Sequence, residues 1–110
     1  MEGLQLVELF LNNNQIGSCR GLAKLDQLRV LDLSLNRITK LGGLVGLVGL
    51  RELRLAKNNV RHIRQVNYLE NLMYLDSLDL SYNPLQERRY YRCQVIYKLP
   101  MLHGLDGSPV

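Results

Sequence analysis

One short pattern recurs four times along this chain of 110 residues, and it constrains the fold more than any other feature. The first copy, LVELFLNNN, runs from Leu6 to Asn14 and reads leucine-x-x-leucine-x-leucine before it ends in asparagine. The copies end at Asn14, Asn36, Asn58 and Asn83, so their spacings are 22, 22 and 25 residues. The last two leucines of a copy alternate, as in a short strand with one buried face. One copy alone cannot bury its leucines, so the copies must stack on one another.

The residues between the copies also repeat, because apolar side chains return at every third position, as in Cys19, Leu22 and Leu25. That spacing suits a 3-10 turn, in which residues i and i+3 share a face. We predict an α/β solenoid with helical turns on its convex face and short parallel strands near 8–12, 30–34, 52–56 and 77–81 on its concave face. The pattern resembles the leucine-rich repeat in its 22-residue form, with four repeats in residues 1–85.

The most apolar stretch, LGGLVGLVGL from Leu41 to Leu50, has three competing interpretations. It is about half as long as the ~20 residues that a membrane-spanning helix needs. A phosphate-binding loop would require a different glycine spacing and a lysine, which the stretch lacks. Because its leucines fall at every third position, we predict that it is the convex return of the second repeat, with glycines where adjacent turns approach closely.

The asparagine that ends each copy has a predicted structural role. The chain must turn back after every strand, which leaves backbone polar groups inside the bend. An asparagine side chain offers a carbonyl and an NH2 group to satisfy them. We therefore expect Asn14, Asn36, Asn58 and Asn83 to form a buried ladder of side chains along the solenoid.

The repeat pattern ends after Asn83, and residues 86–110 follow a different pattern. We predict a helix over 86–98, stopped by Pro100. Arg92 falls on its apolar face, and we favour an arginine that packs its stem and bonds terminal carbonyls or Asp79 or Asp106 over one that binds a ligand.

The string from Tyr91 to Gly107 resembles the C-terminal cap of intracellular 22-residue repeat proteins. That class includes a regulatory subunit of protein phosphatase 1, the spliceosomal A-prime protein, and ciliary or axonemal proteins. The resemblance implies an intracellular chain, cytoplasmic or nuclear, and leaves open a ciliary member or one fused to a guanylate-kinase-like domain. No equivalent cap precedes the first repeat, where Gly3 interrupts the apolar spacing, so we expect further repeats or domains in a longer parent chain.

Catalytic and metal-binding chemistry finds little support in the residues. Cys19 and Cys93 fit no metal-ligand or redox spacing, and neither His62 nor His103 has a nucleophile as an evident partner. Asp32 and Asp79 share one column of the repeat, but Arg54 stands between them and argues against a carboxylate pair. We expect no enzyme activity, no metal and no cofactor.

The remaining hypothesis is a surface that binds a protein or peptide as part of a scaffold or adaptor. Alternate strand residues and their flanks should face outward on the concave side, and aromatic and arginine side chains are the usual anchors of interfaces. Phe10 is the only phenylalanine, and packing against a lost upstream repeat is an equal alternative for it. The candidate partner-binding residues are Glu8, Phe10, Arg29, Asp32, Arg51, Glu52, Arg54, Asp79 and Tyr82.

Two other hypotheses remain open. The net charge is +4, and basic residues cluster at 57–64 and 88–92, which would suit an anionic surface or a nucleic acid. No motif that reads a nucleic-acid groove accompanies them, so we rank this second. The third hypothesis is a spacer with no partner of its own. The sequence leaves the identity of a partner and the cellular process undetermined.

Overall fold

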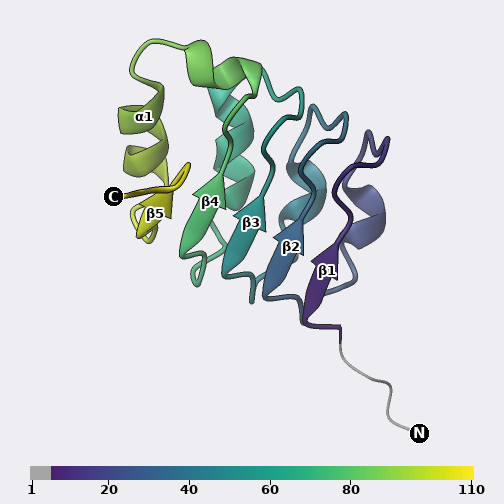
Figure 1. Cartoon of the computed structure of the whole chain (residues 1–110). Coiled ribbons are helices and arrows are strands. Elements are labelled where there is room, and N and C mark those ends of the chain that lie inside the picture. The colour runs from purple at the N-terminus through teal and green to yellow at the C-terminus, as the bar shows by residue number, and fades with distance from the viewer. Residues whose placement is uncertain (1–5) are drawn as a thin grey trace, which may run out of the picture.

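Parallel strands stand side by side in front of a row of short helices, as Figure 1 shows for the computed structural model of the chain. The structure describes residues 6–110, so our expectations about residues 1–5, including Gly3, lie outside the described part. The strands are β1 (Glu8–Phe10), β2 (Val30–Asp32), β3 (Glu52–Arg54), β4 (Ser77–Asp79), β5 (Gly104–Leu105) and β6 (Ser108–Pro109). The helices are η1 (Arg20–Leu22), η2 (Gly42–Leu44), η3 (Ile63–Leu69) and η4 (Pro84–Glu87), all of the 3-10 type, and α1 (Tyr91–Lys98).

One sheet joins all six of these strands in the order of the sequence. Strands β1 to β5 run parallel, and β6 folds back antiparallel to β5. Each of the first four strands ends two residues earlier than we predicted. Between the first two repeats, Ser34 N–H bonds to the Asp32 carboxylate at 2.9 Å, and Leu11 C=O accepts a bond from the Asn36 side chain at 3.0 Å. Side-chain hydrogen bonds thus interrupt the backbone ladder there, although a backbone bond from Asn13 N–H to Ser34 C=O follows at 2.9 Å.

The core lies between the sheet and the helical turns, and leucine dominates it. The strand leucines Leu31 and Leu53 are fully buried, and so are Leu41, Leu44 and Leu47 of the second convex return. Backbone bonds from Leu44 to Leu41 and from Leu47 to Leu44 follow the i to i−3 pattern of a 3-10 turn. This is the α/β solenoid predicted from the repeat. None of the helices within residues 6–110 is long and apolar enough to cross a membrane.

The glycines of the second return differ in how much space they leave for a side chain. A β-carbon at Gly43 would lie 2.6 Å from the carbonyl carbon of Cys19, which no side chain tolerates without a backbone shift. At Gly42 the nearest atoms would be 3.7 Å away, in the ring of Tyr68. The close approach of adjacent turns therefore depends chiefly on Gly43.

The C-terminal helix is shorter than the predicted 86–98. Residues 84–87 form the separate turn η4, Arg88 is extended, and Tyr90 takes a left-handed conformation with φ of 62° before α1 begins at Tyr91. A left-handed residue cannot continue a right-handed helix, so the helix starts afresh. Helix α1 lies beside η3 and η4 at the end of the solenoid, next to β5 (Figure 1).

Arg92 adopts the non-ligand role that we favoured. Its Nη1 donates to Leu105 C=O at 3.1 Å and its Nη2 donates to Pro109 C=O at 2.7 Å. Asp106 bonds other groups than Arg92. Its carboxylate accepts hydrogen bonds from Tyr91 Oη and from Leu80 N–H, both at 2.7 Å. These bonds fasten the last strands to α1 and to the end of the fourth repeat.

Candidate protein-binding face

The register of the parallel strands stacks equivalent residues of the four repeats into rows on the outward side of the sheet, which we call the concave face. The two rows are Glu8, Val30, Glu52 and Ser77, and Phe10, Asp32, Arg54 and Asp79. Because the strands are hydrogen-bonded neighbours, residues of one row are about 4.8 Å apart in the backbone. The candidate residues therefore share one hydrogen-bonded surface.

Phe10 lies at the end of its row, on strand β1. It is 55% exposed, although it is a large aromatic side chain on a sheet. Its neighbour Asp32 is polar, so within the described residues the row gives it no aromatic or aliphatic partner. An exposed aromatic ring on a rigid strand offers apolar area to a partner at little cost in ordering.

Arg54 stands at the centre of the concave face and is engaged by acidic neighbours. Its guanidinium contacts the Glu52 carboxylate on its own strand, and its Nη1 lies 3.8 Å from Asp32 Oδ2 on the neighbouring strand. The Arg54 side chain remains 48% exposed, so part of its donor capacity faces solvent. The pairs orient the guanidinium without enclosing it.

Asp32 and Asp79 prove to be less accessible than we predicted. Asp32 is only 9% exposed, because its carboxylate accepts the Ser34 N–H and lies against Arg54. Asp79 is half-buried and accepts the Ser81 N–H at 2.9 Å and the Ser81 hydroxyl. Both aspartates therefore close the turn after their strand, and Asp32 is a supporting residue for Arg54 rather than an open contact.

A shallow groove of about 600 Å³ borders the concave face where the strands begin. Arg29, Arg51, Glu8 and Glu52 line it, together with Tyr74 and Asp76. Sequence reasoning missed Tyr74, which is 66% exposed. The sequence did contain a signal for it. Tyr74 directly precedes the first leucine of its repeat, and the equivalent residues before Leu28 and Leu50 are the non-aromatic Gln27 and Gly49.

The opposite border of the concave face lies where the chain turns away after each strand. Asn13, Leu35, Lys57 and Tyr82 occupy one equivalent position there, and all have φ between 59° and 61°. Tyr82 is 73% exposed, and Lys57 Nζ lies 5.5 Å from the centre of its ring. This contact occupies one face of the Tyr82 ring. Tyr82 therefore lies on this border of the concave face, at the fourth repeat.

The asparagines tie adjacent repeats together. Asn58 donates to Leu55 C=O of its own turn at 3.0 Å and to Leu33 C=O of the previous repeat at 2.8 Å, and it accepts from Ile38 N–H at 2.9 Å. Asn36 and Asn83 bond in the same manner and are also buried.

Asn14 departs from the predicted ladder. It is exposed, and its side chain donates only within its own repeat, to Leu11 C=O at 2.8 Å and to Asn12 C=O at 3.3 Å. The reason is its place in the first repeat, where no earlier turn within the described residues lies against it.

Two titratable groups within the described residues have clearly shifted pKa values, and both are structural. Burial raises the pKa of the Cys19 thiol to about 11. Burial, then the hydrogen bond donated to Asp106, and then the negative charges of Asp106 and Asp79 raise the pKa of Tyr91 above its usual range. Within residues 6–110 no three histidine, cysteine, aspartate or glutamate side chains come together as a metal site would require.

The basic residues of our second hypothesis come together only in part. Lys57 lies on the concave rim against Tyr82, and the guanidinium of Arg92 is bonded to backbone carbonyls. Arg61 and Arg64 instead line hollows on another edge of the solenoid, together with Lys40, Arg88 and Arg89. Lys57 and Arg92 are therefore separated from Arg61, Arg64, Arg88 and Arg89, which line adjoining hollows.

Comparison with known proteins supports the class that the strands and turns define. The leucine-rich repeat family matches residues 4–110, so the chain belongs to the leucine-rich repeat family. In solved structures, the fold is similar to that in the Drosophila melanogaster SNF/U2A' complex, with a TM-score of 0.77 and 22% identity over 99% of this chain and 80% of that one. This likeness concerns the fold.

Two relatives are similar in sequence as well. Dynein axonemal assembly factor 11 of Trypanosoma brucei brucei is 41% identical over 96% of this chain and 28% of its own length. U2 small nuclear ribonucleoprotein A' of Emericella nidulans is 33% identical over 94% of this chain and 46% of its own length. The chain thus spans less than half of either relative. Proteins of this family act as interaction modules rather than catalysts.

Proposed function

We propose that this chain is a non-catalytic interaction module that binds a protein or peptide on its concave face, within a larger scaffold or adaptor protein. The observation that carries the proposal is the exposure of Phe10 and Arg54 in one row of a hydrogen-bonded sheet. Aromatic and arginine side chains supply most of the binding energy in many interfaces. A preformed sheet also reduces the ordering cost of association.

The contact surface that we propose includes both borders of the face. Arg29, Arg51 and Glu8 would contact the partner where the strands begin, and Tyr82 where they end. Glu52 and Asp79 would act beside them, while Asp32 holds Arg54 in place. The mixture of charged and aromatic groups fits a polypeptide better than a small apolar ligand.

We also propose the finer class: a 22-residue repeat protein of the phosphatase-1-regulator type, with four repeats in 1–85 and a C-terminal cap in 86–110. The spacing of the asparagines supports the class, and the pairing of β5 with β4 beside α1 supports the cap. Similarity to an axonemal assembly factor and to a nuclear ribonucleoprotein supports a cytoplasmic or nuclear location and leaves ciliary association open.

The test compares two pairs of substitutions in the full-length parent protein by affinity purification, followed by direct binding of the recovered partner. Phe10→Ala with Arg54→Gln should weaken binding by about tenfold or more, because two anchors are lost. Glutamine is chosen because a glutamate at position 54 would face Glu52 and Asp32. Thermal melting should change little, since neither side chain belongs to the leucine core.

The matched control is Arg61→Glu with Arg64→Glu, which changes exposed residues away from the concave face. It should leave affinity for the recovered partner within about twofold of the parent. If the control pair abolishes binding and the concave pair does not, the partner binds the basic edge and the proposal fails.

A further inference from the structure

A line of three adjoining hollows runs along the edge of the solenoid that follows the asparagines, and basic side chains line all of it. The first hollow contains Arg20 and Lys40, the second contains Lys40, Arg61 and Arg64, and the third contains Arg64, Arg88 and Arg89. Thr39 and Lys40 belong to both the first and the second, and His62 and Arg64 belong to both the second and the third. The three hollows therefore adjoin one another, and we call them together the basic groove.

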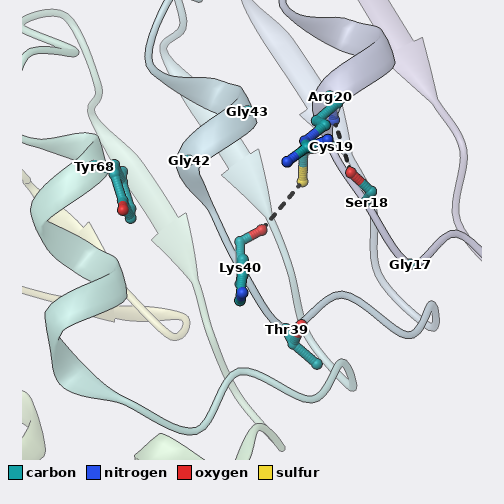
Figure 2. A pocket seen from close by; sticks show the side chains of 9 residues that line it. All are labelled: Gly17, Ser18, Cys19, Arg20, Thr39, Lys40, Gly42, Gly43 and Tyr68. Atoms are coloured by element: carbon teal, nitrogen blue, oxygen red, sulfur yellow. Dashed lines mark hydrogen bonds between the residues drawn. The ribbon is translucent and has the colours of Figure 1, made fainter.

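The first of these hollows is drawn in Figure 2. Arg20 comes from η1, Tyr68 comes from η3, and Lys40 lies between them on the segment that leads into η2. The thiol of Cys19 points to Lys40 C=O at 3.8 Å and is buried, so it contributes no reactive group to the surface. Repeats one to three thus each supply a cation to the basic groove, and the segment before α1 supplies the last two.

The charges of the basic groove are uncompensated within the described part of the chain. None of its lining residues is an aspartate or glutamate. The carboxylates that form ion pairs in residues 6–110, Asp32, Glu52 and Asp76, pair with Arg54 and His103, which lie elsewhere. The six cationic side chains of the groove are Arg20, Lys40, Arg61, Arg64, Arg88 and Arg89.

We propose that the basic groove binds an extended acidic polypeptide segment, independently of the concave face. A linear depression lined by cations at successive repeats is complementary to a linear polyanion rather than to a flat membrane surface. Five of the six cations are arginines, whose planar fork binds carboxylates through two hydrogen bonds.

The aromatic residues beside the basic groove favour a peptide over a single-stranded nucleic acid. Proteins that bind single strands without sequence preference stack bases on aromatic faces. Tyr90 has Arg89 over its ring, 5.2 Å from the centre, and Tyr68 is the single tyrosine among the described residues that line the three hollows. One lining tyrosine cannot stack successive bases, whereas Ser18, Thr39, Asn59 and Gln94 offer hydrogen bonds to a peptide backbone.

The experiment measures fluorescence anisotropy of the 110-residue chain with a labelled peptide of about twelve residues that has glutamate at alternate positions. An oligouridine of equal charge and vesicles that contain phosphatidylserine serve as competing probes. We expect the peptide to bind more tightly than the oligouridine at equal salt, and vesicles not to displace it. Tighter binding of the oligouridine, or displacement by the vesicles, would overturn the proposal in favour of a nucleic acid or a membrane.

Charge-matched variants locate the binding. Arg61→Glu with Arg64→Glu should weaken peptide binding by about tenfold or more, and Arg88→Gln with Arg89→Gln should weaken it through a neutral change. Lys24→Glu with Lys98→Glu alters the net charge as much as the first pair but lies outside both the basic groove and the concave face, and it should cost less than about threefold.

Equal losses in the groove pair and in this control would show general attraction to a basic protein and would overturn the proposal. Phe10→Ala with Arg54→Gln should leave peptide binding unchanged, so failure of the concave-face proposal and failure of this one are distinguishable. If the concave pair removes peptide binding and the groove pairs do not, the acidic peptide binds the concave face.

Discussion

The first and third repeats carry the same sequence pattern but have different environments. In the third repeat, Leu53 is fully buried, and Asn58 is 9% exposed and bonds the turn of the repeat before it. In the first repeat, the equivalent Leu9 is only partly buried and the equivalent Asn14 is exposed and bonded within its own turn. The pattern therefore specifies the local shape of a repeat, whereas burial comes from having a neighbour on each side.

The opposite end of the solenoid has such a neighbour. Strand β5 pairs with β4, Leu78 is 1% exposed, and Leu80 is fully buried. Tyr91 and Asp106 reinforce this end, because the Tyr91 hydroxyl and the Leu80 N–H both bond the Asp106 carboxylate. The asymmetry implies that the free energy of each repeat depends on its place in the array, and the predictions below measure that dependence.

The largest difference is expected for the strand leucines. Leu53→Ala should reduce the free energy of unfolding by about 3–5 kcal/mol, because it leaves a cavity between two repeats. Leu9→Ala should cost less than about 2 kcal/mol, since part of its side chain is already in contact with water. Urea denaturation of the two variants measures both values, and equal losses would show that the first repeat is as well supported as the third.

The ladder asparagines should show a smaller contrast in the same direction. Asn58→Ala removes bonds to Leu33, Leu55 and Ile38 and should cost about 1–3 kcal/mol, because buried backbone groups lose their partners. Asn14→Ala should cost less than about 1 kcal/mol, because water can replace the bonds of an exposed side chain. Melting of Asn58→Ala at the temperature of the parent would show that the ladder contributes nothing to stability.

Two adjacent glycines test how tightly the first and second returns pack. Gly43→Ala should cost about 1–2 kcal/mol, since the new methyl group would meet the backbone of Cys19. Gly42→Ala is the matched control and should stay within about 0.5 kcal/mol of the parent, because an ordinary contact with Tyr68 results. A tolerated alanine at position 43 would mean that the first return moves easily away from the second.

The same contrast explains what the sequence could predict. The strands, the 3-10 returns and the burial of Asn36 and Asn58 follow from local spacing, because each copy of the pattern repeats the same contacts with its neighbour. The exposure of Asn14 and the partial burial of Leu9 depend on what lies beside the first repeat, which no residue within that repeat encodes.

The candidate binding surfaces were predictable only in part. Register alone placed Phe10 and Arg54 in one row, since parallel strands without bulges keep equivalent residues adjacent. The burial of Asp32 depends on a side-chain bond to the Ser34 backbone, and the joining of Arg20 with Arg88 along one groove depends on segments distant in sequence. Such long-range placement is absent from any single copy of the pattern.

The smallest effect concerns the two cysteines, and it tests whether one neighbouring repeat is enough to bury a side chain of the first repeat. Cys19 belongs to the first repeat, yet the second return covers it to 2% exposure, whereas Cys93 on α1 is exposed. Because burial raises the pKa of Cys19 to about 11, the thiol stays protonated at pH 8 and is a poor nucleophile. A bulky thiol reagent at pH 8 should therefore label one cysteine rapidly in the native protein and both in denaturant.

The raised pKa of Cys19 also fixes the sign of a pH dependence. The folded state favours the protonated thiol, so its contribution to stability is complete below the unfolded pKa near 9 and is lost as the pH rises toward about 11. Cys19→Ser should remove this part of the alkaline loss, while Cys93→Ser should leave it unchanged. Rapid native labelling of Cys19, identified by peptide mass, would show that the convex side of the first repeat opens as readily as its strand side, and that a single neighbour does not hold it closed.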